Sequence, residues 1–282
     1  MISIIICSVN SSLLKDLKIN IQNTIGIEYE IIAIDNSQNN NSIAKVYNIG
    51  FDKAKYEFLL YLHEDIFFHS NDRGQCIVDI FSESKDIGLI GVAGAKFKSR
   101  SPSLWTNVAI NSWAMHLKQR LPDGTVHFNS SDWCNEKKYI DVKVIDGVFM
   151  STRKSLNIRF DEHIPGFHFY DTYLSLKVSL YGFRSVVSNQ FLIEHFSCGN
   201  QSIECIKAAN YFHSKYNRFM PLGSLIKDQA VIEYDNLQRF IELCIPNNLN
   251  YLAITYWIKL FYQKPLMKKN ILLLKRILIS IF

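Results

Sequence analysis

The chain has 282 residues, of which 48% are hydrophobic, 20% charged and 13% aromatic. This composition excludes a chain that is disordered throughout, and the length suits one large α/β domain with or without a helical extension. The formal net charge of +5 is modest. A nucleic-acid-binding protein usually carries a denser basic face, so we expect no nucleic-acid partner; a phosphate-bearing substrate or an anionic membrane surface fits this charge at least as well.

The six cysteines are scattered and include no C-x-x-C pair. This spacing argues against a zinc module and against a dense disulfide framework. The chain opens with an apolar, strand-like run from Met1 to Cys7 that lacks the basic region and cleavage site of a signal peptide. We therefore expect a reducing, cytoplasmic location.

The first ninety residues alternate between strand and helix patterns. Residues Ile2 to Val9 are almost continuously apolar, which is typical of a parallel strand buried on both faces. Asn10 or Ser11 is placed to cap a helix that runs to about Asn23. The same reading predicts further strands at Glu30–Asp35, Tyr56–Leu62 and Ile87–Val92, and helices at Ile43–Ala54 and Gln75–Ser84. This alternation predicts a Rossmann-like α/β fold with a doubly wound, mostly parallel sheet.

The periodicity is lost between Gly94 and Tyr139, where Ser, Asn, Trp and Gly are frequent. We interpret this segment as a long excursion with short strands, and substrate binding is a natural use for it. Its tryptophans Trp105, Trp113 and Trp133 could stack on the rings of a ligand, although tryptophan is more often a packing residue. Regular structure returns as strands within Tyr139–Thr152, a helix at Tyr170–Tyr181 and a strand at Ser185–Ile193.

Helical spacing continues from Gln201 to the end of the sequence, so we expect a core domain at residues 1–220 and a helical extension at 221–282. The segment Leu266–Phe282 mixes basic residues with Ile and Leu, and its apolar run is too short to span a bilayer. Peripheral contact with a membrane and packing on the domain or on a second subunit both remain open for this segment.

Three predicted strands end in polar groups, which are Cys7-Ser8, Asp35-Asn36-Ser37 and His63-Glu64-Asp65. Ligands of an open parallel sheet bind beyond the carboxyl ends of its strands. The sequence has neither the glycine-rich dinucleotide fingerprint nor the Walker phosphate loop, which disfavours both of those sites. An apolar strand that runs into His63-Glu64-Asp65 indicates a site for Mg²⁺ or Mn²⁺, the alternative being a solvated strand end.

The phrases EIIAIDNS and YNIGFDKAKYEFLLYLHED resemble the family 2 glycosyltransferases of the GT-A fold. The resemblance implies that Asp35 contacts the base of a nucleotide-sugar and that Asp65 is the last residue of the metal-binding Asp-x-Asp motif. His63 stands at the first position of that motif, and whether His63 or Glu64 assists the metal is open. The residues that we assign to the sugar-donor nucleotide are Cys7, Ser8, Asp35, Ser37, Asn48 and Glu64.

Two later segments, FDEHIPGFHFYDTYLSLKVSLYGF and IEHFSCGN, are similar to the acceptor side and the metal side of the same family. The resemblance assigns the general base to Asp171, with Tyr170 where a Glu is often found, and it adds His195 to the metal ligands Asp65 and His63. Asp146-Gly147 matches a position that lines the cleft. We expect the helix N-terminus to lower the pKa of Asp171 and keep it ionised; the alternative is an Asp that only caps the helix.

The resemblance implies an inverting, metal-dependent glycosyltransferase of bacterial surface-glycan synthesis. It would move a sugar, by default from a uridine-diphosphate donor, to a hydroxyl of a glycan or lipid-linked glycan at the inner face of the cytoplasmic membrane. A sugar nucleotidyltransferase is an alternative, but the segment CSVNSSLLKD lacks the glycine-rich basic loop expected of one. A glycan-binding or scaffolding protein that kept the fold and lost turnover is the other alternative, favoured by the departures at His63 and Tyr170.

Overall fold

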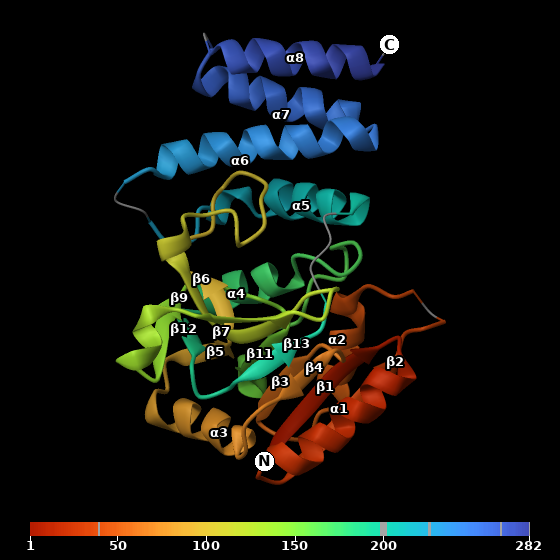
Figure 1. The fold of residues 1–282 in the computed structure, drawn as a ribbon, viewed down its shortest axis with the longest axis vertical. Coiled ribbons are helices and arrows are strands. Elements are labelled where there is room, and N and C mark those ends of the chain that lie inside the picture. The colour runs from red at the N-terminus through yellow and green to blue at the C-terminus, as the bar shows by residue number, and fades with distance from the viewer. Residues whose placement is uncertain (39, 198–201, 225–226, 266, 282) are drawn as a thin grey trace.

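The computed structural model describes residues 1–38, 40–197, 202–224, 227–265 and 267–281. Two β-sheets and their flanking helices form one part of the molecule, and four helices stack at its other end (Figure 1). Residues 198–200 of the IEHFSCGN segment, and the two end residues of the segment 266–282, lie outside the described residues.

The larger sheet has seven strands in the order β2-β1-β3-β11-β5-β12-β9. Strands β1, β2 and β3 are parallel, whereas β11 runs antiparallel to both β3 and β5. The α/β class is therefore confirmed, with a parallel N-terminal half and a mixed remainder. The strands are β1 Ile2–Ser8, β2 Tyr29–Asp35, β3 Phe58–Leu62, β5 Ile87–Gly91, β9 Tyr139–Val142, β11 Phe149–Arg153 and β12 Arg184–Ser188.

Helices cover both faces of this sheet, and they explain the unbroken apolar run of β1. Ile4 and Ile6 share a buried cluster with helices α1 and α3, whereas Ile5 packs on the opposite side with α2 and α4. Asn10 caps α1 by accepting hydrogen bonds from the N–H groups of Ser12 and Leu13, as the sequence predicts. The helices are α1 Ser11–Thr24, α2 Ile43–Lys53, α3 Arg73–Glu83 and α4 Tyr170–Leu180.

The smaller sheet has the order β10-β6-β7-β13-β4, with β8 paired to β7. Its central strand β7 is eight residues long and lies inside the segment that we had interpreted as an irregular excursion. The strands are β4 Ile66–Phe68, β6 Ala93–Ala95, β7 Trp113–Arg120, β8 Val126–Ser130, β10 Val144–Ile145 and β13 Ile193–His195.

The prediction of one strand over Ser185–Ile193 is wrong, because the chain leaves the larger sheet after Ser188 and enters the smaller one at Ile193. Polar side chains hold the bend between them. Ser188 Oγ donates to the carbonyl of Lys138, and Asn189 Nδ2 donates to the carbonyls of Cys134 and Lys137. These bonds redirect the chain, and β13 thereby reaches β4 and β7.

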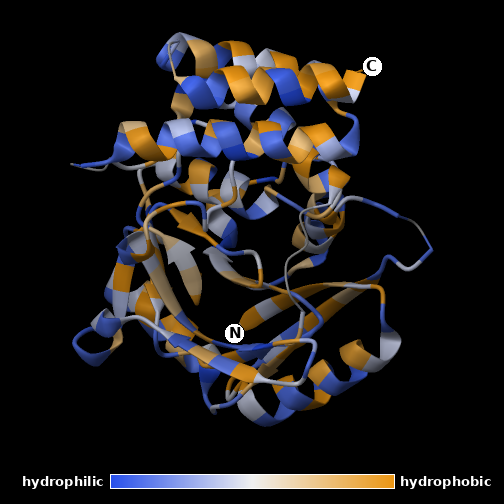
Figure 2. Ribbon diagram, turned by 45° about the horizontal axis from the view of Figure 1, so that its top comes forward, coloured by the Kyte–Doolittle hydropathy of each residue, from blue (hydrophilic) through white to orange (hydrophobic). Residues whose placement is uncertain are grey.

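The helices after residue 201 follow the prediction of helical structure. They are α5 Ile203–Lys215, α6 Gln229–Cys244, α7 Asn250–Gln263 and α8 Lys268–Ile281. Their apolar sides share one buried cluster that also includes Phe169 and Leu176, and both hydrophobic and hydrophilic residues lie along each helix (Figure 2). Among the described residues, no helix combines the length and apolar content needed to cross a membrane. Short 3₁₀ helices occur at η1 Ile110–Ser112, η2 Asp132–Asn135, η3 Lys154–Leu156, η4 Asn217–Phe219 and η5 Ile245–Asn247.

Candidate active site

The three parallel strands end at one edge of the larger sheet. Ser8 at the end of β1 is paired with Asp35 at the end of β2, and Ile6 is paired with Leu62 at the end of β3. The segment His63–Asp65 follows directly after Leu62. The register therefore brings the three polar strand ends to the same side of the sheet, as the sequence pattern indicates.

His63, Asp65 and His195 form a cluster whose ligand atoms lie within 4.8 Å of one another. Asp65 Oδ1 is 3.8 Å from His63 Nδ1, and Asp65 Oδ2 is 3.6 Å from His195 Nε2. The pairing of β13 with β4 creates this arrangement, since it sets His195 opposite Ile66 and joins the N–H of Phe196 to the carbonyl of Asp65. Residues far apart in the sequence are thus held as one group.

Neighbouring side chains fix both imidazoles of this cluster. His195 Nδ1 lies 3.2 Å from Gln119 Oε1, which makes Nδ1 the protonated nitrogen. Nε2, on the side of Asp65, then accepts a hydrogen bond from Ser197 Oγ at 3.2 Å. His63 Nε2 lies 2.6 Å from the Tyr170 hydroxyl, so Nδ1 is the nitrogen that faces Asp65. Burial, and then the neighbouring His195, lower the pKa of His63. A neutral imidazole is the form that ligates metal.

Two imidazole nitrogens and one carboxylate fit a divalent transition-metal cation. Mg²⁺ prefers a shell of oxygen atoms, whereas a mixed nitrogen and oxygen set suits first-row cations such as Mn²⁺ better. The structure assigns His63 rather than Glu64 to this group of ligand atoms.

Glu64 points to the β1–α1 turn instead. Its carboxylate accepts hydrogen bonds from Ser8 Oγ at 2.6 Å and from the N–H groups of Val9 and Asn10 at 3.1 Å. Ser8 and Glu64, which we expected at the sugar-donor nucleotide, are therefore bonded to each other and shape the end of β1. Burial, and then Glu64, raise the pKa of the half-buried Cys7 thiol to about 11 and keep it neutral.

Asp35 stands at the exposed end of β2. Its Oδ1 accepts hydrogen bonds from the N–H of Ser37 at 2.9 Å and from Ser37 Oγ at 2.6 Å. These bonds lower the pKa of Asp35 and keep it ionised. Asp35 and Ser37 are both exposed, so their side-chain oxygen atoms can accept hydrogen bonds from a ligand.

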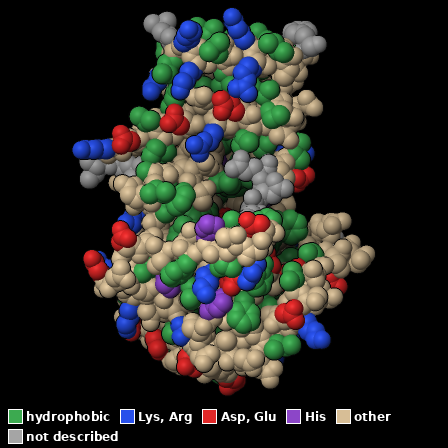
Figure 3. Space-filling view, viewed as in Figure 1, with side chains coloured by type: hydrophobic (Ala, Val, Ile, Leu, Met, Phe, Trp, Pro, Cys, Tyr) green, Lys and Arg blue, Asp and Glu red, His purple; other side chains and the backbone are tan. Residues whose placement is uncertain are grey.

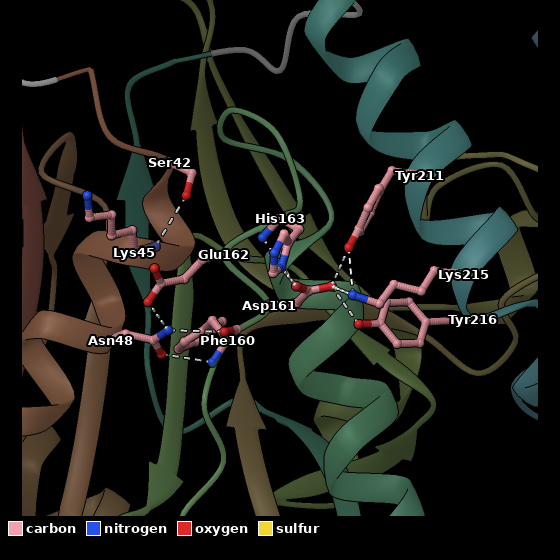
Figure 4. A network of polar contacts seen from close by, with 10 residues as sticks. All are labelled: Ser42, Lys45, Asn48, Phe160, Asp161, Glu162, His163, Tyr211, Lys215 and Tyr216. Atoms are coloured by element: carbon pink, nitrogen blue, oxygen red, sulfur yellow. Dashed lines mark hydrogen bonds and ion pairs between the residues drawn. The ribbon is translucent and has the colours of Figure 1, made fainter.

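The amide of Asn48, one of the predicted nucleotide contacts, forms its hydrogen bonds within the protein. Asn48 Nδ2 donates to the carbonyl of Phe160 at 3.0 Å and to Glu162 Oε1 at 2.8 Å, while its Oδ1 accepts from the N–H of Phe160 at 2.8 Å (Figure 4). Asn48 is also buried. Asn48 therefore attaches the segment between β11 and α4 to helix α2.

Asp161, next to this attachment, fastens the same segment to α5 and the 3₁₀ turn that follows it. Its Oδ2 accepts hydrogen bonds from Tyr216 at 2.6 Å, Lys215 at 2.9 Å and Tyr211 at 3.1 Å (Figure 4). The segment before α4 is thus tied on one side to the sheet's helix α2 and on the other to the C-terminal helices.

A cleft of about 470 Å³ joins the histidine cluster to the start of α4. That volume is in the range of small-molecule sites. Its lining includes the predicted residues His63, Asp146, Gly147, Tyr170, Asp171 and His195. The predicted nucleotide contacts Cys7, Ser8, Asp35, Ser37, Asn48 and Glu64 are not part of this lining.

Two features fix the wall of the cleft around Asp146 and Gly147. Asp146 Oδ2 accepts from Trp105 Nε1 at 2.8 Å and Oδ1 accepts from the N–H of Val148 at 2.9 Å. A Cβ atom on Gly147 would lie 2.0 Å from the Tyr170 hydroxyl oxygen, so glycine allows Tyr170 to reach His63. The sequence does not predict the contact of Gln119 with His195, because the segment around Gln119 has no recognisable pattern. Trp105 is noted in the sequence, but its hydrogen bond to Asp146 is not predicted.

Asp171 lies in the first turn of α4, and Phe169 is the N-cap residue, so Asp171 is not the capping Asp of the alternative. Its Oδ1 accepts from the N–H of Thr172 at 2.6 Å. The expected lowering of its pKa is wrong. Desolvation of the partly buried carboxyl, and then the nearby Asp146, raise the pKa of Asp171 to about 7, and the hydrogen bonds of Thr172 and Gly147 only partly offset this.

The fold and the cleft together define an α/β protein with a His–Asp–His cluster and a partly buried acid at the carboxyl edge of its sheet. A family model described as "Glycosyltransferase like family" matches residues 3–218, and the chain belongs to this family. Among curated proteins, none matches the chain in sequence.

Several solved structures share the fold at low sequence identity. The mannosyltransferase PcManGT from Pyrobaculum calidifontis, in complex with GDP-Man and Mn²⁺, has a TM-score of 0.54 and 12% identity, over 100% of this chain and 80% of that one. GalNAc-T7 with UDP, GalNAc and Mn²⁺ has a TM-score of 0.53 and 11% identity, over 86% of this chain and 56% of that one. TarS 1-349 of S. aureus in complex with UDP has a TM-score of 0.50 and 13% identity, over 89% and 74%. These likenesses confirm the GT-A type of fold.

The contact between Tyr170 and His63 predicts the effect of Tyr170→Phe on metal binding. Loss of the hydroxyl frees the His63 ring, so we expect the Mn²⁺ dissociation constant, measured by calorimetry, to rise about tenfold. Tyr61→Phe is the matched control, because Tyr61 lies in the same aromatic cluster and its buried hydroxyl has no hydrogen-bond partner among the described residues. An unchanged constant for Tyr170→Phe, or an equal rise in both variants, would contradict the assignment.

The raised pKa of Asp171 predicts that Asp171→Asn stabilises the metal-free protein at high pH. Below about pH 4 the carboxyl is protonated in both folded and unfolded chains, and the substitution has little effect. As pH rises from about 4 to about 7 the wild type loses stability, because the carboxyl ionises first in the unfolded chain, where the pKa is 3.8; above about pH 7 the loss is complete. Urea unfolding in EDTA at about pH 8 should show a gain of up to roughly 4 kcal/mol.

The control for this measurement is Asp35→Asn, which changes an exposed carboxyl whose pKa is lowered rather than raised. It should give no gain at high pH. A stability difference between Asp171→Asn and wild type that stays constant from acid to alkaline pH would show that burial does not perturb Asp171.

Proposed function

We propose that this member of the family is a metal-dependent, inverting glycosyltransferase with a nucleoside-diphosphate-sugar donor, uridine diphosphate by default. One observation supports this most strongly: a single cleft is lined by His63 and His195, the two histidines that group with Asp65, and by Asp171. The first suits a cation that binds diphosphate, and the second suits proton removal from an acceptor hydroxyl.

On the sugar-donor side, His63, Asp65 and His195 would hold a divalent cation, and their nitrogen-rich set favours Mn²⁺ over Mg²⁺. When bound, the cation supplies positive charge that offsets the charge developing on the leaving diphosphate. Asp35 and Ser37 would accept and donate hydrogen bonds at the base. Ser8 and Glu64 would act indirectly, by fixing the end of β1 beside Cys7.

On the acceptor side, Asp171 is the general base. With a pKa of about 7, roughly half of the carboxyl is ionised at neutral pH, and the ionised form is basic enough to take a proton. Asp146 is less suited, because both of its oxygens accept hydrogen bonds from the protein. As Asp171 takes the proton, the acceptor oxygen bonds to the anomeric carbon, and the bond from that carbon to the diphosphate oxygen breaks with its electron pair. A direct displacement of this kind inverts the anomeric carbon.

Residues 1–220 would form the catalytic domain and residues 221–282 the helical extension. The acceptor would be a glycan or lipid-linked glycan of bacterial surface-glycan synthesis, in the cytoplasm at the inner face of the membrane. The complexes of PcManGT with GDP-Man and Mn²⁺ and of GalNAc-T7 with UDP, GalNAc and Mn²⁺ support a nucleotide-sugar donor and a divalent cation here.

The experiment is sugar-donor hydrolysis by the purified protein across UDP-, GDP- and dTDP-sugars, with Mn²⁺, Mg²⁺ or EDTA. We expect one sugar donor to be cleaved with Mn²⁺ and not in EDTA, and Asp65→Ala to lower the rate at least about a hundredfold, since a metal ligand is lost. Asp171→Ala should still hydrolyse the sugar donor but fail to transfer. The control Asp79→Ala changes an exposed carboxylate on α3 and should match wild type.

Absence of both cleavage and nucleotide binding with every sugar donor would overturn the transferase proposal and favour a glycan-binding protein. Cleavage that persists in EDTA and in Asp65→Ala would refute the role of the metal cluster while leaving the transferase reaction intact.

A further inference from the structure

Helix α8 lies at the end of the molecule farthest from the two sheets, and it is buried on one side alone (Figure 1). Asn270, Leu273 and Ile277 face the other helices and are buried. On the opposite side Leu272 is 49% exposed and Ile279 is 77% exposed. Because these two residues are seven apart, they lie on one stripe of the helix. No packing within the chain covers this apolar stripe.

The neighbouring helix α7 presents a second exposed apolar stripe. Tyr251 and Tyr262 are each 81% exposed, and Ile254 and Ile258 lie between them at helical spacing. The two helices are joined where α7 begins and α8 ends, since Ser280 Oγ donates to Asn250 Oδ1 at 3.0 Å. Tyrosine and isoleucine side chains exposed together are typical of the boundary between water and lipid.

The charge of this region has a single sign. Residues 243–282 contain no Asp or Glu and six basic residues, whereas the remainder of the chain has 25 Lys and Arg against 26 acidic residues. The six basic residues are Lys259, Lys264, Lys268, Lys269, Lys275 and Arg276. Arg276 pairs with Glu242 of α6 at 3.6 Å, but Lys268, Lys269 and Lys275 form no ion pair within the described part of the chain. Figure 3 shows basic and hydrophobic side chains intermixed at this end of the molecule.

We propose that the outer face of α8, flanked by the α7 stripe, docks on an anionic lipid bilayer. Leu272 and Ile279 would enter the boundary of the acyl chains, while Lys268 and Lys275, which lie on the same outward side, would meet the headgroups. A second copy of the chain is a poor occupant, because a symmetric contact through this face would set lysines against lysines. A polyanionic partner without apolar groups is also a poor occupant, because it would contact the lysines but would not bury Leu272 and Ile279.

Docking through α8 also sets the height of the cleft above the bilayer. Helices α5 to α8 are stacked between the cleft and that face (Figure 1). With neighbouring helix axes about 8–10 Å apart, the cleft would lie roughly 30 Å from the membrane. If the proposed transferase function holds, the acceptor hydroxyl must be carried away from the bilayer, as on an extended lipid-linked glycan. The docking itself needs no turnover.

The experiment is co-sedimentation of the full chain with vesicles, which requires neither sugar donor nor activity. Vesicles of phosphatidylcholine alone are compared with vesicles that contain about 30 mol% phosphatidylglycerol. We expect binding to the anionic vesicles and at least tenfold weaker binding to the neutral ones. Lys268→Glu/Lys275→Glu should weaken anionic binding more than tenfold, and Leu272→Ser/Ile279→Ser should weaken it at every salt concentration.

The matched control is Lys15→Glu/Lys18→Glu, which makes the same charge change on α1, a helix of the sheet-bearing part with the exposed Ile19 beside it. It should bind vesicles like wild type, and unchanged circular dichroism should show that all variants are folded. The proposal is overturned by equal or absent binding to the two kinds of vesicle, by equal losses in the α1 and α8 variants, or by concentration-dependent dimerisation that Ile279→Ser abolishes while vesicle binding is unchanged.

Discussion

The pairing of β13 with β4 is the contact on which the site depends. β4 starts directly after Asp65, and β13 ends at His195, so one short antiparallel ladder sets a carboxylate against an imidazole that is 130 positions later in the sequence. The same strand β13 pairs with β7, which carries Gln119 to the other side of His195. Without the bend after Ser188, β13 would continue the larger sheet and the histidine would not reach the cleft.

Burial explains the electrostatic character of the cleft. Asp171 is partly buried in the wall of the cleft and lies near Asp146, and both features raise its pKa, whereas the exposed Asp35 is held ionised by Ser37. The two acids therefore suit different tasks, one exchanging a proton and one accepting hydrogen bonds. Tyr170 links the two halves of the cleft, because it precedes Asp171 in the chain and its hydroxyl holds His63.

Much of the fold and part of the site follow from the sequence, because both rest on local patterns. Strands such as β1 are readable since their apolar runs are buried between two layers of helices, and the strand-end motif His63-Glu64-Asp65 marks the edge where ligands bind. The resemblance supplied His195 and Asp171, and the structure places both in one cleft with His63.

What the sequence does not predict depends on contacts between distant segments. Asn48 and Glu64 are polar residues in motif positions, yet their side chains satisfy backbone groups of Phe160 and of the β1–α1 turn. The pKa of Asp171 is raised because desolvation at the cleft wall outweighs its position at a helix start, and desolvation is a property of the packed molecule. Gln119 belongs to no sequence motif, because only the pairing of β7 with β13 places it beside His195.

Pulsed electron paramagnetic resonance on the Mn²⁺-loaded protein tests the central claim, that His63, Asp65 and His195 together bind a divalent cation. Modulation of the Mn²⁺ echo by directly bound ¹⁴N reports imidazole ligands. We predict coupling to two histidine nitrogens, with one lost in His63→Ala and the other lost in His195→Ala. A spectrum without ¹⁴N coupling, or one that neither substitution changes, would contradict this account of the site.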